Sequence, residues 1–185
     1  MDDIIPFLIG FSGKIIDEID DQKLNINNLF TQSLKSLNVC LFTLTSRNDF
    51  LFTFSTLILS LFGAGVDTDY WKSFIFISIF LSILYITPVN NWKLFIVILI
   101  LIIISTRIEE NKFPEEYSIK KLICRVVGLI FFSGLLLIPT FLKKYDFYIS
   151  TTNITYIRKL ILIALGGLTV SIFFQIYFLI NSNQV

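Results

Sequence analysis

The chain has 185 residues, of which 55% are hydrophobic and only 16% are charged, and its formal net charge is +1. Soluble domains carry about 25% charged residues, so this composition is typical of a membrane protein. A net charge near zero argues against nucleic acid as a partner, and the chain has no histidine, the commonest general base and metal ligand. We therefore expect the lipid bilayer to be the main partner, and no nucleic acid.

The N-terminal region predicts two helices whose relation to the membrane the pattern leaves open. Residues 4–16 are apolar but only about 20 Å long as a helix, short of a hydrocarbon core of about 30 Å. Residues 24–46 carry leucines at helical spacing beside a polar stripe, which consists of Asn28, Gln32, Lys35 and Asn38. Such a helix either lies at the membrane interface or crosses the membrane with its polar face packed inside a bundle.

Five apolar segments follow, and each predicts a membrane-spanning helix. They are residues 50–66, 73–87, 94–106, 122–142 and 160–180. In the last of them, Gly166, Gly167 and Ser171 predict a small-residue face that allows close packing against another helix.

The predicted fold is thus all-α, a polytopic transmembrane helix bundle with five spans. The number rises to seven if residues 2–20 and 24–46 also cross the membrane. We treat residues 1–185 as a single integral membrane domain. Its acidic and amphipathic N-terminal helices occupy residues 1–48, and its transmembrane bundle occupies residues 49–180.

Four acidic residues follow the first apolar segment: Asp17, Glu18, Asp20 and Asp21. In a helix, Asp17, Asp20 and Asp21 share one face, where like charges repel one another and oppose the macrodipole of the helix C-terminus. A nearby cation would relieve this repulsion. Because oxygen ligands without histidine or cysteine suit Mg²⁺, we predict these three aspartates as metal ligands.

Further charges join this site in the seven-helix arrangement, which places the acidic loops on one side of the membrane. The predicted supporting acids are Glu18, Asp67, Asp69, Glu109, Glu110, Glu115 and Glu116. Lys121 and Arg125 lie beside them and are predicted to bind a phosphate. With five spans, the acidic motif lies on the opposite side from the other acids, and the larger number of Lys and Arg residues there places the N-terminus inside. The alternative interpretation is that these acids form a solvated loop surface.

The two cysteines do not have the spacing of a metal site. Cys40 and Cys124 stand singly in apolar stretches, so we predict both to be packed thiols.

The motif Asp17–Asp21 resembles, in its chemistry, the aspartate-rich motifs of the UbiA family of intramembrane prenyltransferases. That resemblance implies a metal-bound diphosphate, although the family's Asn-Asp-x-x-Asp start is missing here. The chain also resembles uncharacterised multi-pass membrane proteins of large DNA viruses that infect algae and amoebae. This second resemblance rests on residues 13–21 (GKIIDEIDD), 47–50 (RNDF) and 113–118 (FPEEYS), together with Arg125, and implies an integral membrane protein without an assigned activity.

Three functions fit these observations. The first is a structural or accessory membrane protein whose acids are solvated or contact other membrane subunits. The second is a Mg²⁺-dependent enzyme acting on a lipid phosphate or diphosphate through the acidic face. The third is a small cation transporter or channel, although the predicted spans contain almost no ionisable residue beyond Arg125. The sequence assigns no catalytic residue and no cellular compartment.

Overall fold

The computed structural model describes residues 4–21, 26–46, 50–63, 69–84, 100, 118–137 and 151–182. These residues form six helices and no strand, which confirms the all-α prediction. The helices are α1 (Ile4–Asp21), α2 (Asn28–Ser46), α3 (Phe50–Gly63), α4 (Asp69–Leu84), α6 (Ile119–Leu135) and α8 (Thr151–Ser182).

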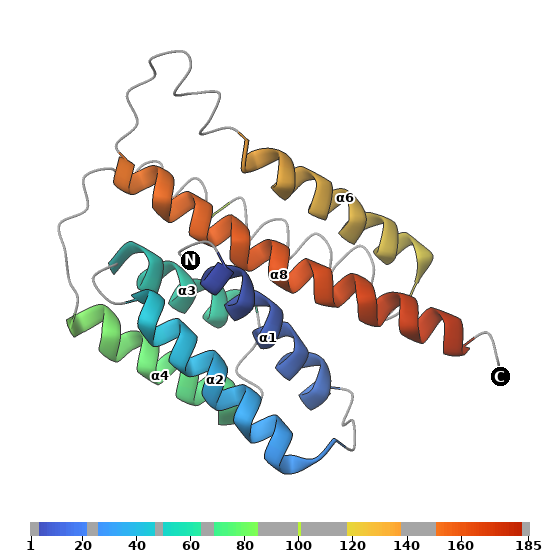
Figure 1. Cartoon of the computed structure of the whole chain (residues 1–185), viewed down its shortest axis with the longest axis horizontal. Coiled ribbons are helices and arrows are strands. Elements are labelled where there is room, and N and C mark those ends of the chain that lie inside the picture. The colour runs from blue at the N-terminus through green and yellow to red at the C-terminus, as the bar shows by residue number, and fades with distance from the viewer. Residues whose placement is uncertain are drawn as a thin grey trace.

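The helices lie side by side in a bundle, in which the long helix α8 runs between α6 and α1 (Figure 1). Helix α1 packs most extensively against α8, α2 packs against α1, α3 against α4, and α6 against α8. Figure 1 shows α1 ending, and α6 beginning, at the end of the bundle where α8 finishes. We call this the acidic end, because Asp17, Glu18 and Asp20 lie in the last turns of α1.

Only one segment of the described residues is long and apolar enough to cross a membrane. It runs from Thr155 to Asn181 in α8, with a mean hydropathy of 2.1, and it contains the last predicted span. The helices at three other predicted spans are shorter: α3 has 14 residues, α4 has 16 and α6 has 17. At 1.5 Å per residue they reach about 21–26 Å, less than a hydrocarbon core of about 30 Å. The described helices therefore do not support the prediction of five spans, and of residues 94–106 the structure describes residue 100 alone.

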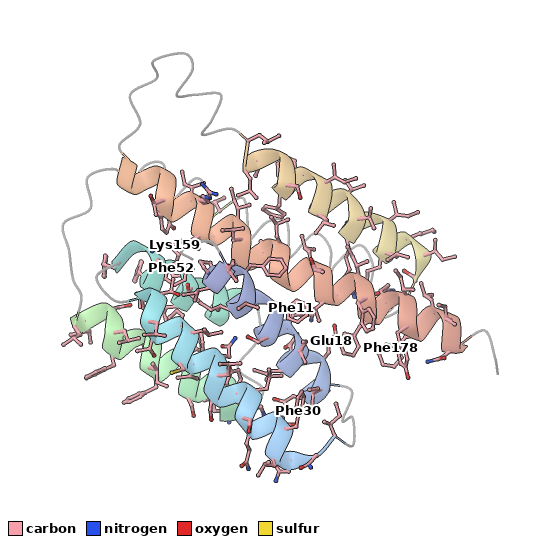
Figure 2. The ribbon with its side chains drawn as sticks, in the orientation of Figure 1. Phe11, Glu18, Phe30, Phe52, Lys159 and Phe178 are labelled. Atoms are coloured by element: carbon pink, nitrogen blue, oxygen red, sulfur yellow. The ribbon has the colours of Figure 1, made fainter. Side chains whose placement is uncertain are left out.

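An aromatic cluster forms the core where α2, α3 and α4 meet. Phe42 is fully buried, with its ring centroid 4.6 Å from that of Phe74 and 6.1 Å from that of Phe52. Lys159 of α8 lies over the Phe52 ring, with its Nζ 5.4 Å from the ring centroid (Figure 2). Burying each phenylalanine contributes about 1.5–3 kcal/mol, so this cluster fixes α2 relative to α3 and α4.

Glycines allow α1 and α8 to approach until their backbones touch. A Cβ atom built on Gly10 would overlap the backbone carbonyl of Ile163, and one built on Gly166 would overlap the backbone carbonyl of Phe7. A Cβ atom on Gly167 would lie 3.8 Å from the carbonyl oxygen of Gly10. The prediction of a small-residue packing face around Gly166 and Gly167 is confirmed.

Candidate functional site

The acidic residues near the end of α1 are held by a lysine one turn earlier in the same helix. The ammonium nitrogen Nζ of Lys14 lies 2.5 Å from Oδ2 of Asp17 and 3.3 Å from Oε1 of Glu18. The spacings are i+3 and i+4, at which helix side chains face one another. Glu18 is buried, so its carboxylate needs this positive charge close by.

A second lysine joins α2 to the same part of α1. Nζ of Lys35 lies 2.8 Å from Oδ2 and 3.0 Å from Oδ1 of Asp20. The same nitrogen lies 5.5 Å from the ring centroid of Tyr70, in the first turns of α4. The Lys35 ammonium therefore links α1, α2 and α4 through an ion pair and a cation–π contact.

These pairs show how the repulsion predicted for the acidic motif is relieved. Asp17 and Asp20, two of the three predicted metal ligands, each bind a different lysine. The third, Asp21, is the last residue of α1, and its side chain lies outside the described part. Among the described residues, no group of three or more acidic or cysteine side chains is arranged to hold a metal ion. The Mg²⁺ assignment stays a prediction.

Asn38 lies at the centre of a buried hydrogen-bond network next to these ion pairs. Its amide nitrogen donates to the carbonyl oxygen of Ile9 and to Oγ of Ser12, both at 2.8 Å. Its amide oxygen accepts a hydrogen bond of 2.6 Å from the Tyr70 hydroxyl. Of the polar stripe on α2, Asn38 is thus packed inside the bundle, whereas Asn28 and Gln32 are exposed.

Arg125 of α6 is hydrogen-bonded to α8. Its guanidinium donates to the carbonyl oxygen of Ser171 at 3.1 Å and to Oε1 of Gln175 at 3.0 Å. The amide of Gln175 in turn donates to the carbonyl oxygen of Ser118 at 3.1 Å. This chain of bonds attaches the beginning of α6 to α8.

The predicted phosphate ligands, Lys121 and Arg125, lie one turn apart on α6. The backbone nitrogen of Lys121 donates to Oγ of Ser118, which caps the helix. The side chains of both residues are partly exposed. Their phosphate-binding role stays a prediction.

The structure describes few of the supporting acids. Glu18 is buried and paired with Lys14, and Asp69 begins α4, although its side chain lies outside the described part. The other predicted members of the face also lie outside the described residues: Asp67, Glu109, Glu110, Glu115 and Glu116.

The prediction that both cysteines are packed thiols is wrong for Cys40, which is exposed on α2, while Cys124 on α6 is half-buried. Sequence reasoning also missed the role of Tyr70, which is buried and bonded to Asn38. Lys14 was recognisable from its spacing to Asp17 and Glu18. No local signal connected Lys35 to Asp20, because the two residues lie on different helices.

The chain matches no known protein-family model, and comparisons with curated proteins and with solved structures found no significant similarity. The two resemblances described above therefore stay predictions.

Proposed function

We propose that this chain is a multi-pass integral membrane protein with a structural or accessory role, in which charged and polar side chains hold helices together. The observation that carries the proposal is the distribution of side chains between the surface and the interior. Large apolar side chains face outwards over several helices, and polar side chains lie inside.

The outward-facing side chains are large and apolar on three different helices. The exposed fraction is 72% for Phe76 of α4, 67% for Ile130 of α6 and 67% for Phe173 of α8. Helix α6, every residue of which the structure describes, has no buried residue at all. A surface of this kind is unfavourable in water and is expected where the surrounding solvent is lipid or another membrane subunit.

The interior of the bundle is rich in polar side chains. Those that are fully buried or nearly so and hydrogen-bonded are Asn38, Thr53, Ser55, Ser78 and Gln175. Asn38 and Gln175 are bonded to neighbouring helices, and the hydroxyl of Ser55 is hydrogen-bonded to that of Tyr156 in α8. In a bilayer such groups must find partners within the protein, because lipid offers none.

The contacts made by the charged side chains support a structural role. Lys14 and Lys35 hold the carboxylates of the acidic motif, and Arg125 joins α6 to α8. The contacts of Lys35 and Arg125 each join two helices, and the contacts of Lys14 stabilise the C-terminal turns of α1. An accessory subunit needs such a rigid framework, with its apolar outer surface available to lipid and to other membrane subunits.

We expect the protein to stay in the membrane on alkaline carbonate extraction. In a background with Cys40 and Cys124 replaced, single cysteines at Gln22, Thr68 and Asn111 should all react with a membrane-impermeant maleimide from the same side. This follows because α1 ends at the acidic end and α6 begins there (Figure 1). Release of the protein by carbonate, or labelling of Gln22 from the opposite side to Thr68 and Asn111, would contradict the proposal.

The structural role also predicts a weak response to divalent ions. Millimolar Mg²⁺ should leave the thermal unfolding midpoint of the purified protein unchanged, because lysines already neutralise Asp17 and Asp20. Ca²⁺ and an equal ionic strength of NaCl serve as controls. A rise of the midpoint with Mg²⁺ that disappears in the double variant Asp17→Asn, Asp20→Asn would instead favour the metal-dependent enzyme.

A further inference from the structure

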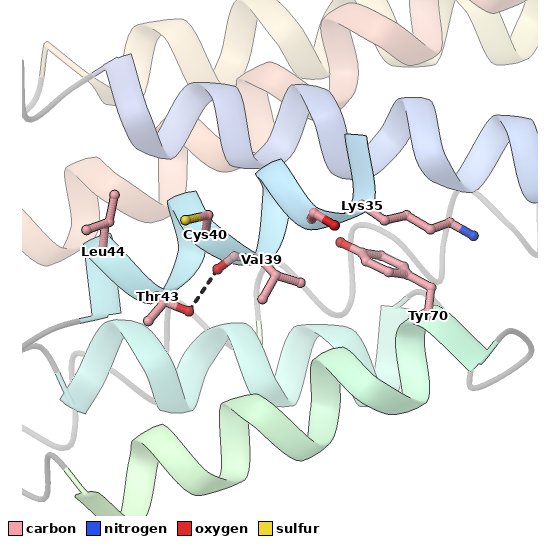
Figure 3. Close-up of a pocket in the computed structure, with 7 residues that line it drawn as sticks. Lys35, Val39, Cys40, Thr43, Leu44 and Tyr70 are labelled. Atoms are coloured by element: carbon pink, nitrogen blue, oxygen red, sulfur yellow. Dashed lines mark hydrogen bonds between the residues drawn. The ribbon is translucent and has the colours of Figure 1, made fainter. Parts of the chain in front are cut away.

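A groove of about 500 Å³ runs along α2 beside the first turns of α4 (Figure 3). It is lined by Lys35, Ser36, Val39, Cys40, Thr43, Leu44 and Tyr70. The groove follows the helix axis from Lys35 to Leu44, a distance of about 14 Å at 1.5 Å per residue. Its volume falls within the range of sites that hold small molecules.

The two ends of the groove differ in chemistry. At one end the lining includes Lys35, whose ammonium forms an ion pair of 2.8 Å with the carboxylate of Asp20 on α1; Asp20 adjoins the groove through this pair without lining it, and neither side chain is fully buried. Towards the other end, the lining consists of Val39, Leu44 and the methyl-bearing Thr43, whose hydroxyl donates to the carbonyl oxygen of Val39 at 2.8 Å. An occupant that matches both ends has a charged head and an apolar tail.

We infer that this groove binds one acyl chain of a phosphatidylethanolamine molecule, with the headgroup on the Lys35–Asp20 pair. The inference rests on the proposed membrane location. A positive and a negative group side by side complement a zwitterion: Lys35 donates to the lipid phosphate, and the lipid ammonium donates to Asp20. A phosphatidylcholine headgroup has no N–H group to donate to Asp20, and an anionic headgroup without an ammonium leaves Asp20 facing a negative charge.

Cys40 provides the measurement because it is exposed, it lines the groove, and the half-buried Cys124 on α6 serves as an internal reference. The full chain in detergent is alkylated with N-ethylmaleimide, and mass spectrometry of its peptides gives the rate at each cysteine. Phosphatidylethanolamine at ten times its dissociation constant should slow alkylation of Cys40 about tenfold and leave Cys124 unchanged. Phosphatidylcholine and phosphatidylglycerol should have little effect.

Three variants on α2 complete the test. Thr43→Trp places a large side chain in the groove and should abolish the protection, whereas Ser33→Trp, on the same helix but outside the groove, should keep it. Lys35→Gln should also abolish the protection by removing the phosphate donor. Circular dichroism confirms that each variant is folded.

Each contrary outcome overturns the inference. Equal protection by phosphatidylcholine or phosphatidylglycerol would show that the ion pair does not select the headgroup. No protection by any lipid, or full protection in Thr43→Trp, would show that the groove is not the binding site. Extraction of the protein by carbonate would instead count against the proposed membrane location, so the two failures are distinguishable.

Discussion

Replacing Gly10 by alanine is expected to lower the free energy of unfolding by about 3 kcal/mol, in the upper part of the range for overpacked cores. The added methyl group would overlap the backbone carbonyl of Ile163. A backbone atom in the middle of α8 cannot rotate away as a side chain does, so α1 and α8 must separate and lose their mutual packing. Gly166→Ala should have a similar effect, because its methyl group would overlap the carbonyl of Phe7.

The matched control for these variants is Gly134→Ala. Gly134 lies in α6, and a Cβ atom there meets no heavy atom within 4 Å. Alanine also favours the helix by about 1 kcal/mol over glycine, so this variant should be as stable as the parent protein or slightly more stable. Unfolding of all three variants in detergent micelles, followed by circular dichroism, gives the comparison. If Gly10→Ala proves as stable as Gly134→Ala, the close contact between α1 and α8 is wrong.

Replacing Asn38 by leucine is expected to lower the free energy of unfolding by about 2–3 kcal/mol, although the two side chains are similar in size. The substitution removes the bonds to Ile9 and Ser12 and leaves the buried hydroxyl of Tyr70 without its acceptor on Asn38. A buried polar group that loses its partner costs about 1–3 kcal/mol. The exposed Gln32, two turns earlier on α2, provides the control, because Gln32→Ala should change stability by less than about 0.5 kcal/mol.

A double-mutant cycle separates this network from a simple loss of packing. Tyr70→Phe removes the hydroxyl that bonds to Asn38, so the double variant Asn38→Leu, Tyr70→Phe should lose less stability than the sum of the two single variants. The difference should be of the order of 1 kcal/mol, as for other residues in direct contact. Strictly additive losses would mean that Asn38 and Tyr70 act independently, and the assignment of Asn38 as the link between α1, α2 and α4 would be wrong.

Both predictions concern contacts that the sequence indicated only in part. The glycines of α8 were identified as a packing face because small residues allow helices to approach closely. Their partner, Gly10, carries no signal of its own, since a lone glycine in an apolar helix has several explanations. Asn38 was placed on a polar stripe, but the stripe alone did not distinguish a helix at the interface from one packed in a bundle.

The sequence by itself determined the helical class and the approximate positions of the helices, and its spacing allows Lys14 to pair with Asp17 and Glu18, as the structure shows. These properties depend on residues within a few turns of one another, and the period of the α-helix fixes which of them share a face.

The tertiary structure alone decided that Lys35 holds Asp20, that Tyr70 binds Asn38, and that Arg125 is bonded to α8. It also reduced the predicted spans to one candidate among the described helices. Each of these outcomes depends on which helices become neighbours and where each helix ends. Neighbours far apart in sequence are selected by the packing of whole helix faces, and this information is not contained in the spacing of residues along any one helix.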